Sequence, residues 1–183
     1  MAHTNDKTQR CEIWDVLNED STPRGYTKER GTLVEGEYHL VVRSWIVQAN
    51  GDFLVSKRSG SKPWPLLWET PGGAALAGEE SLTAAIREVY EEIGVALDPK
   101  NAHFFKRQSK PRPNSTSGGA VFDDWIFYQN VKLYDTYLDF SEVCDIMYAS
   151  EDKIKEMIAE KKFLSYEFCP HLDGIFEFVK TKR

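Results

Sequence analysis

Three glutamates at helical spacing are the first residues whose types and positions suggest chemistry. Glu88, Glu91 and Glu92 stand at i, i+3 and i+4, so in a helix their carboxylates would share one face. Like charges at this spacing repel each other, whereas a divalent cation between them would reverse the sign of the interaction. A carboxylate cluster without nearby cysteine or histidine suits a hard ion such as Mg²⁺ or Mn²⁺. Taken alone, such a segment is more often an acidic helix face in solvent.

These glutamates belong to a longer pattern that starts at Gly73. Five residues separate Gly73 from Glu79, and seven more separate Glu79 from the segment 87–95. The result is G-x5-E-x7-R-E-U-x-E-E-x-G-U, where U is aliphatic and every fixed position is matched. Each of the non-aliphatic positions matches by chance about one time in 15, so the odds at one start site are on the order of one in 10⁸. The pattern is the Nudix box, and the chain therefore resembles the Nudix hydrolase superfamily.

The resemblance implies both a fold and a reaction. Members of the superfamily fold as an α/β/α sandwich around a mixed sheet, with the box as a loop–helix–loop. They hydrolyse a small-molecule diphosphate linked to another group, X, with Mg²⁺ or Mn²⁺. By the resemblance Glu88, Glu91 and Glu92 bind the metal, and either Glu91 or Glu92 could ionise the attacking water. A metal that bridges carboxylates and phosphate oxygens neutralises charge and lowers the pKa of bound water, which such a reaction requires.

Three further residues of the box, and Gly72 just before it, are assigned roles by the same resemblance. Arg87 typically orients a glutamate, Glu79 serves the outer shell, and the backbone carbonyl at Gly72 or Gly73 can reach a metal. The glycine pair also lets the backbone come close to the carboxylates. The ordinary alternatives are a simple turn for the glycines and, for Arg87, a surface salt bridge worth ~0–1 kcal/mol.

Segments outside the box narrow the resemblance to the Nudix branch of the type I isopentenyl-diphosphate isomerases and their hydrolase-like relatives. The segments are Glu12-x-Trp14-Asp15, Gly36-Glu37-x-His39, Lys57-Arg58-Ser59 and Pro65-x-x-Trp68. The isomerases use a catalytic cysteine followed by a metal-binding histidine, and the corresponding segment here, 68–74 (WETPGGA), contains neither. This absence and the intact box favour hydrolysis. Isomerase activity and a non-catalytic nucleotide-binding role are the alternatives.

Cations upstream of the box are candidates for substrate contact. Lys57, Arg58 and Lys62 could meet the outer phosphate, or they could form the solvated end of a strand. His39 lies near the position of a metal-binding histidine in the isomerases, but a histidine beside an apolar run is more often a core residue. The identity of X depends on loops outside the box, here expected over 59–71 and 108–119.

Acidic residues downstream of the box are the other candidates. Asp123 and Asp124 begin an apolar strand, near the place where the isomerases keep a metal-binding carboxylate. They are equally explained as a solvent-facing strand edge. Glu142 lies on the late loop from which some Nudix enzymes draw their base, and we include it among the substrate-binding candidates.

The elements that must position these residues follow from local patterns. Alternating or apolar runs predict strands over 11–17, 38–47, 53–57, 103–107, 121–131 and 142–148. Helical spacing predicts helices over 81–93, 151–160 and 172–179. We expect Ser81 and Ser150 to cap helices and Gly94 to end the first one. Strands interleaved with a few helices indicate an α/β or α+β sandwich.

Composition limits the function further. The chain of 183 residues has 41% hydrophobic residues and a formal charge of −6, which excludes bulk attraction to nucleic acid or to an anionic membrane. We expect an N-terminal arm or hairpin over 1–35, paired with the sheet edge or a second subunit, and one Nudix domain over 36–183. Three widely spaced cysteines and the lack of a signal peptide or an 18-residue apolar run predict a cytoplasmic protein. The sequence leaves a homodimer open.

Overall fold

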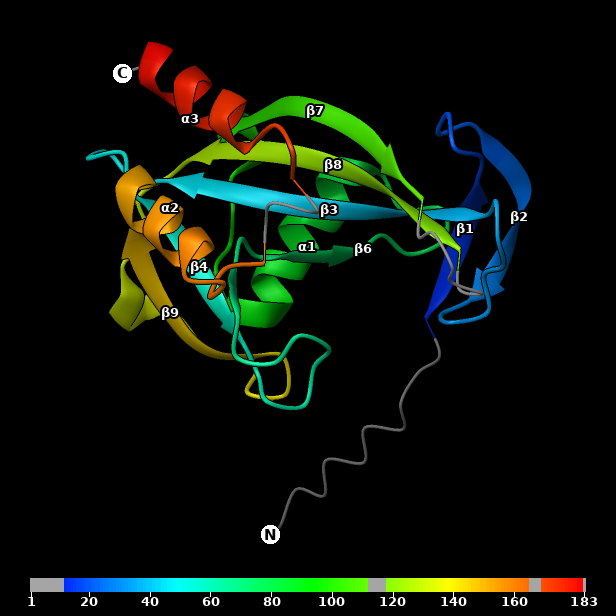
Figure 1. Ribbon diagram of the computed structural model, residues 1–183, viewed down its shortest axis with the longest axis horizontal. Helices are drawn as coiled ribbons and strands as arrows, with labels where there is room; N and C mark the ends of the chain where they lie inside the picture. The colour runs from blue at the N-terminus through cyan, green and yellow to red at the C-terminus, as the bar shows by residue number, and fades with distance from the viewer. Residues whose placement is uncertain (1–11, 112–117, 165–168, 183) are drawn as a thin grey trace, which may run out of the picture.

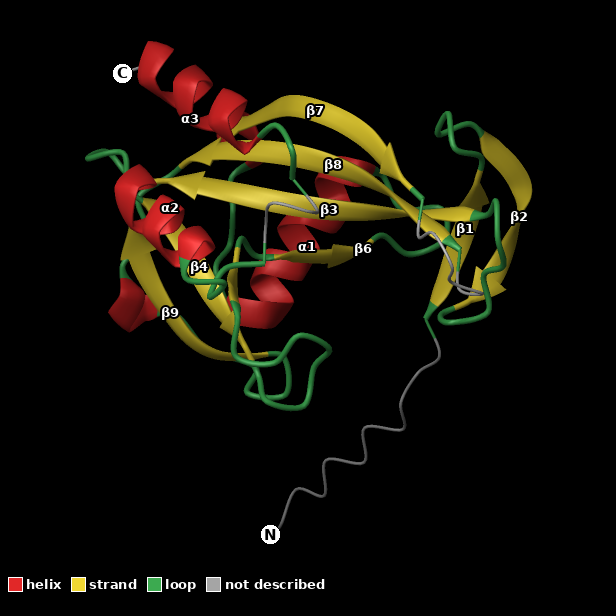
Figure 2. Ribbon diagram, in the orientation of Figure 1, coloured by secondary structure: helices red, strands yellow, loops and turns green. Residues whose placement is uncertain are grey.

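The computed structural model describes residues 12–111, 118–164 and 169–182. Figure 1 shows one sheet with helices on both of its faces, and Figure 2 shows that strands make up its middle layer. This is the α/β/α arrangement that the sequence predicted. Within these ranges no helix is both long and apolar enough to cross a membrane.

Strand β3 (Tyr38–Val47) lies at the centre of the sheet. It pairs in parallel with β8 (Gly119–Tyr128) along its whole length. Its other edge pairs antiparallel with β1 (Ile13–Leu17), β6 (Gly72–Ala74) and β4 (Phe53–Arg58). The sheet is therefore mixed, and β6, which contains the first glycine of the box, is bonded directly to its central strand.

Four more strands extend the sheet on both sides. β7 (Ala102–Lys110) pairs antiparallel with β8. β9 (Val143–Ala149) and the short β5 (Trp68–Glu69) pair antiparallel with β4. β2 (Pro23–Glu29) pairs antiparallel with β1.

The helices divide between the two faces of the sheet. α1 (Ser81–Ile93) covers one face, and α2 (Glu151–Ala159) and α3 (Leu172–Thr181) cover the other. The short 3₁₀ helices η1 (Pro99–Asn101) and η2 (Leu133–Asp135) lie in the connections before β7 and before β9.

The side-chain alternation of β3 supplies both cores. Val42 and Ile46 pack with the apolar face of α1, whereas Trp45 and Val47 pack with α2 and α3. Successive residues of a strand point to opposite faces, so a nearly continuous apolar run is what a strand covered on both sides requires.

The box helix forms as predicted but begins differently. α1 ends at Gly94, which has φ of 70° and donates its N–H to the Tyr90 carbonyl. The expectation that Ser81 caps the helix is wrong, since the N-cap residue is Glu80 and makes no side-chain capping bond. Instead, the Ser81 hydroxyl donates to the Asp123 carboxylate at 2.5 Å. Ser150 caps α2 as predicted, accepting from the Lys153 N–H at 3.2 Å.

Other strands differ from the predicted ones where a strand pairs with a segment that is distant in the sequence. β2 has no counterpart among the predicted strands, because its sequence is polar and it is exposed over most of its length. β7 continues to Lys110, past the predicted 103–107, so the loop expected over 108–119 is shorter; residues 112–117 of it lie outside the described residues. β5 forms inside the predicted irregular loop 59–71.

The hairpin of β1 and β2 is joined to the rest of the fold by a buried carboxylate. Glu37 accepts from the Lys28 ammonium at 2.6 Å, the Tyr26 hydroxyl at 2.8 Å and the Val34 N–H at 2.9 Å. Burial raises its pKa, but these hydrogen bonds outweigh that effect and lower the pKa to about 2. Leu17 of β1 also lies opposite Tyr38 of β3.

Replacement of Glu37 by glutamine is expected to lower the free energy of unfolding at neutral pH by about 1–3 kcal/mol, as for other hydrogen-bonded charges. A lowered folded-state pKa stabilises the protein above the ordinary value of 4.5, and this contribution is lost as the pH falls from 4.5 towards about 2. Urea unfolding of both proteins across this pH range should show their stabilities converging in acid. A difference that stays constant with pH would contradict the role of the charge.

Candidate active site

Helix α1 presents its three box carboxylates beside β6. Ala85, Val89 and the other buried apolar residues of the helix pack against the sheet. The box glutamates lie on the neighbouring face of the helix. Glu92 and Glu88 are largely buried there, with side-chain exposures of 4% and 16%. Glu91 is more open, at 59%.

Glycine is required on β6 because the strand passes between β3 and these carboxylates. A Cβ on Gly72, whose φ is 155°, would collide with the Val42 carbonyl of β3. A Cβ on Gly73 would collide with the carboxylate of Glu88. The Gly72 N–H donates to Glu92 Oε2 at 3.3 Å. The close approach that was predicted for the glycine pair is therefore present.

Arg87 connects the carboxylates of the box to one another. Its Nε and Nη2 donate to the two oxygens of Glu79 at 2.8 and 2.9 Å. Its Nη1 donates to Glu88 and to Glu91, each at 2.9 Å, and Nη2 also donates to the Ala74 carbonyl at 3.1 Å. Arg87 thus orients two of the three glutamates of α1, Glu88 and Glu91, through hydrogen bonds. The surface-salt-bridge alternative does not describe this half-buried network.

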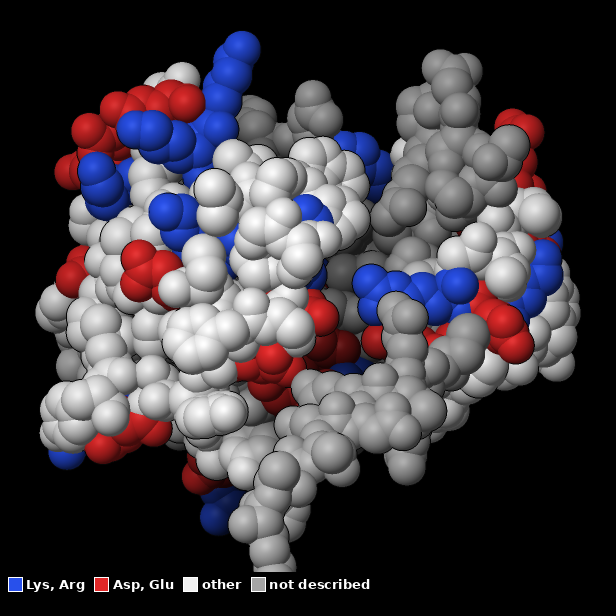
Figure 3. All heavy atoms as spheres, turned by 90° about the horizontal axis from the view of Figure 1, so that it is seen from below, with Lys and Arg blue, Asp and Glu red and all other residues white. Residues whose placement is uncertain are grey.

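A cavity of about 470 Å³ opens over these carboxylates, and acidic side chains gather in the recess seen in Figure 3. Six carboxylates and two cations are among its described lining residues: Glu12, Glu88, Glu91, Glu92, Asp139, Glu142, Arg30 and Lys62. Arg30 pairs with Glu12 at 3.0 Å. The cavity therefore has an excess of negative charge over the positive charge of its walls.

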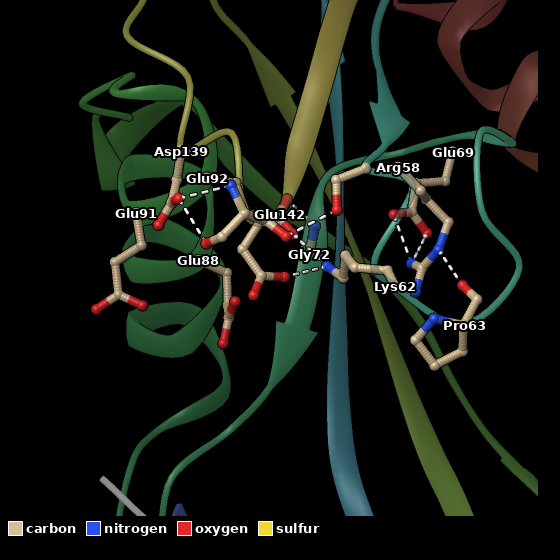
Figure 4. A network of polar contacts seen from close by, with 12 residues as sticks. Arg58, Lys62, Pro63, Glu69, Gly72, Glu88, Glu91, Glu92, Asp139 and Glu142 are labelled. Carbon is tan, nitrogen blue, oxygen red and sulfur yellow. Dashed lines mark hydrogen bonds and ion pairs between the residues drawn. The ribbon is translucent and has the colours of Figure 1, made fainter. Parts of the chain in front are cut away.

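Lys62 is the cation that reaches into the carboxylate cluster, as Figure 4 shows. Its ammonium lies 3.4 Å from Glu92 Oε1 and also forms an ion pair with Glu142. Glu142 thus lies at this cavity, on the loop where it was predicted.

The electrostatics of the cluster fit a divalent cation. Burial raises the pKa of Glu88 to about 7 although Arg87 opposes the shift. Burial raises the pKa of Glu92 to about 8 although Lys62 opposes it. The protein's own cations therefore do not fully compensate the two buried carboxylates. An all-oxygen donor set that lacks positive charge suits Mg²⁺ or Mn²⁺, and Glu88, Glu91, Glu92 and a backbone carbonyl of the glycine pair are the groups available to hold it.

A larger cavity of about 960 Å³ adjoins the first. Lys62, Glu142 and the two glycines of β6 are among the residues that line both cavities. Its far walls carry aromatic and apolar side chains: Trp14, Trp64, Phe122 and Leu164. An anionic region that continues into an apolar one suits a ligand with a charged end and an uncharged end.

His39 is a wall residue of the larger cavity. It is buried, its Nδ1 lies 3.2 Å from the Gly119 carbonyl, and its ring stacks on Trp14 with centroids 4.0 Å apart. The smaller, carboxylate-lined cavity does not include it among its described lining residues. The structure therefore favours the core-histidine interpretation over a ligand of the box metal.

The other two of the three predicted upstream cations, Arg58 and Lys57, have separate positions. Arg58 lines the larger cavity but is neutralised by Glu69, to whose oxygens Nη1 donates at 2.7 and 2.8 Å, while Nε donates to the Pro63 carbonyl. Lys57 lies with its ammonium 5.6 Å from the centre of the Trp68 ring and lines neither cavity. The predicted contact of Lys57 with substrate therefore has no support from its position, which is outside both described cavities.

Asp123 and Asp124 do not form a solvent-facing edge. β8 lies between β3 and β7, and both carboxylates are fully buried on opposite faces. Asp123 accepts twice from Arg107 at 2.6 Å. Neither carboxylate lines a described cavity. The substrate-binding assignment is corrected accordingly, since each aspartate is the internal partner of an arginine.

Asp124, Cys169 and His171 also place their potential ligand atoms within 4.8 Å of one another. Both oxygens of Asp124 are already occupied: Oδ1 accepts from Arg43 and Trp45, each at 2.8 Å, and Oδ2 contacts Arg43 at 2.6 Å and His171 at 2.7 Å. Burial raises the pKa of the Cys169 thiol to about 12, which disfavours the thiolate that metal binding needs. This cluster is an ion-pair network that anchors the start of α3.

Some residues of the site carry no sequence signal of their own. Arg30 reaches the cavity because β2 pairs with β1, and Asp139 because the segment after η2 folds back onto α1, where its N–H donates to the Glu92 carbonyl at 3.0 Å. The sequence indicated Glu12 and Trp14 only through the segments that resemble the isomerase branch of the family. No local pattern marks any of the four, because their positions depend on long-range pairing.

Comparisons with known proteins define the family. The NUDIX domain model matches residues 37–171. The chain is 36% identical over 170 residues to a Nudix hydrolase of Listeria innocua, with 91% of this chain and 94% of the relative covered. The chain therefore belongs to the Nudix family. It is a Nudix hydrolase.

Two further comparisons concern the branch of the family and the fold. An isopentenyl-diphosphate Delta-isomerase of Shigella flexneri is 33% identical over 103 residues, which is 53% of this chain and 57% of the isomerase. The crystal structure of a Deinococcus radiodurans protein superposes with a TM-score of 0.65 at 19% identity, covering 93% of this chain and 98% of the other. The first supports the predicted isomerase-like branch, and the second supports the fold.

Replacement of Gly73 by alanine is expected to weaken Mn²⁺ binding about tenfold or more, the effect typical of disturbing groups that orient metal ligands. The added Cβ meets the flexible end of Glu88, so the carboxylate moves while the fold is kept. Gly60→Ala is the matched control, since a Cβ there meets nothing within 4 Å. Titration of Mn²⁺ followed by calorimetry would measure both. Equal affinity in the two variants would show that Glu88 does not hold the metal.

Proposed function

We propose that this protein is a divalent-metal-dependent hydrolase that cleaves a diphosphate linked to another chemical group. The observation that carries the proposal is the pair of buried, incompletely compensated carboxylates, Glu88 and Glu92, at the floor of a cavity. Folding alone does not favour such a pair. A bound Mg²⁺ or Mn²⁺ would supply the missing charge, and it would also neutralise a diphosphate and acidify a water molecule.

The protein's own groups have distinct tasks in this proposal. Glu88, Glu91 and Glu92 hold the metal, and Arg87 keeps Glu88 and Glu91 oriented through the hydrogen bonds that its Nη1 donates to both. Lys62 is one of the two cations among the described residues that line the smaller cavity, and it could contact a phosphate placed there. Glu142 can accept a proton from water once its ion pair with Lys62 opens.

In this proposal each of the two cavities holds a different part of the substrate. The diphosphate is placed over the carboxylates, and X extends into the larger cavity, against Trp14, Trp64 and Phe122. Aromatic and apolar walls stabilise an uncharged or aromatic group by burial.

The test is release of phosphate or pyrophosphate in millimolar Mg²⁺ from a panel of diphosphates, with EDTA as the control. The panel contains nucleotide sugars, ADP-ribose, dinucleoside polyphosphates, intact and oxidised nucleoside triphosphates, and isopentenyl diphosphate. Turnover of one class that stops with EDTA would support the proposal and identify X. Absence of metal-dependent turnover on every member would contradict it.

The isomerase alternative is less well supported by the site. Neither described cysteine lines a cavity: Cys144 donates to the Arg58 carbonyl, and Cys169 is buried beside α3. No thiol among the described residues is therefore positioned to protonate an alkene. Conversion of isopentenyl diphosphate to its isomer by the purified protein would reverse this conclusion.

A further inference from the structure

The position of Lys62 has a consequence for metal binding that goes beyond the proposed function. Its side chain is 17% exposed, and its ammonium lies between two carboxylates, Glu92 and Glu142. Of the two cations among the described lining residues of the smaller cavity, Arg30 is paired with Glu12. Lys62 is thus the cation that compensates the deepest carboxylate of the cluster.

The backbone around Lys62 is fixed, so its side chain is the part that can change position. The Ser59 N–H donates to the Glu142 carbonyl at 2.9 Å, and the Ser59 hydroxyl donates to the Ser141 carbonyl at 2.7 Å. On the other side of Lys62, Arg58 Nε donates to the Pro63 carbonyl at 2.8 Å. These bonds hold the loop at both ends of the segment that carries the lysine.

We propose that Lys62 is the resident counter-ion of the carboxylate cluster, and that a divalent metal ion must displace its ammonium from Glu92 in order to bind. Lys62 is therefore a positioning residue that sets metal affinity. The proposal rests on the metal site of the proposed function. Its physical basis is that an ammonium and a metal ion compete for the same carboxylate oxygens and repel each other at short range.

The direction of the effect follows from charge alone. Removal of the ammonium favours binding of any cation to Glu92, including a proton. A divalent ion gains about twice as much as a proton from the loss of a nearby positive charge, because the interaction is proportional to charge. The net change therefore favours the metal, even when binding releases one proton.

The experiment measures Mn²⁺ affinity by calorimetry, without substrate, in the wild type and in Lys62→Met. The expected result is binding that is about tenfold tighter in the variant. Lys57→Met is the matched control, because Lys57 lies near the end of β4 and lines neither cavity. The Mn²⁺ affinity of this variant should equal that of the wild type. Lys62→Arg, which keeps the charge, should also stay close to the wild type.

A second measurement uses the wild type and does not depend on the folding of a variant. An amine-acylating reagent and mass spectrometry would compare the reaction rates of Lys62 and Lys57 with and without saturating Mn²⁺. Metal binding should raise the rate at Lys62 severalfold and leave Lys57 unchanged.

The outcomes separate this inference from the proposed function. If Mn²⁺ binds the wild type but Lys62→Met binds it equally or more weakly, and acylation of Lys62 does not respond to metal, the inference is overturned while the metal site stands. If Mn²⁺ does not bind the wild type in the millimolar range, both fail.

Discussion

Replacement of Glu92 by glutamine is expected to lower the rate of diphosphate hydrolysis by about 10²- to 10³-fold, the range for loss of one group that supports electrostatic stabilisation of the transition state. Glu92 is the most buried carboxylate of the cluster and contacts both Lys62 and the Gly72 N–H. Glutamine has the same shape but lacks the charge that a metal requires. Steady-state kinetics on the substrate found in the panel, at saturating Mg²⁺, would measure the loss.

The same substitution should leave the metal-free fold intact or stabilise it. A carboxylate whose pKa is raised to about 8 by burial is costly to keep in the interior. Thermal unfolding in EDTA should therefore give a midpoint equal to or above that of the wild type. Glu156→Gln, on the exposed side of α2, is the control for both measurements. Full activity in Glu92→Gln would contradict the assignment of the site.

Replacement of Asp124 by asparagine is expected to be strongly destabilising, lowering the free energy of unfolding by about 3–5 kcal/mol. Asp124 is fully buried, and Arg43, Trp45 and His171 all direct polar atoms at it. Burial raises its pKa, but these bonds outweigh burial and hold the pKa below its ordinary value. The variant removes the negative charge that pairs with the buried guanidinium of Arg43.

Urea unfolding at neutral pH would measure this change. Asp145→Asn is a matched control, because Asp145 is exposed on β9 and its replacement should change the stability by less than about 0.5 kcal/mol. The thermal midpoint of Asp124→Asn should fall by about 6–20 °C, given the usual 2–4 °C per kcal/mol for a chain of this size. A loss no larger than that of the control would show that the network contributes little to stability.

The sequence is most informative where the structure is local. Helix α1, its end at Gly94, the Asn-Gly hairpin between β3 and β4 and the neighbourhood of the box carboxylates all depend on residues close together along the chain. Helical spacing and turn residues record such local relations directly. The spacing of the box residues is therefore enough to place the three carboxylates on one face of this helix.

The aspartates of β8 show why other features could not be predicted. Asp123 and Asp124 resemble a polar strand end, yet each is neutralised by an arginine from a neighbouring strand, 16 or 81 residues away in the chain. Only the pairing of β8 with both β3 and β7 brings these charges together. A similar limit applies to β2, whose polar residues carry no strand pattern and whose formation depends on β1.

The hairpin of β1 and β2 supplies cavity walls without supplying any box residue. Glu12, Trp14 and Arg30 come from this hairpin or directly flank it, whereas the groups proposed to hold the metal come from the contiguous stretch 72–92. In the proposed assignment, the hairpin therefore contributes to the wall of the ligand cavity, and the residues that would hold the metal lie in a separate stretch of the chain. Substitutions in the hairpin are therefore expected to alter which ligand fits the cavity while leaving the proposed metal-binding residues in place.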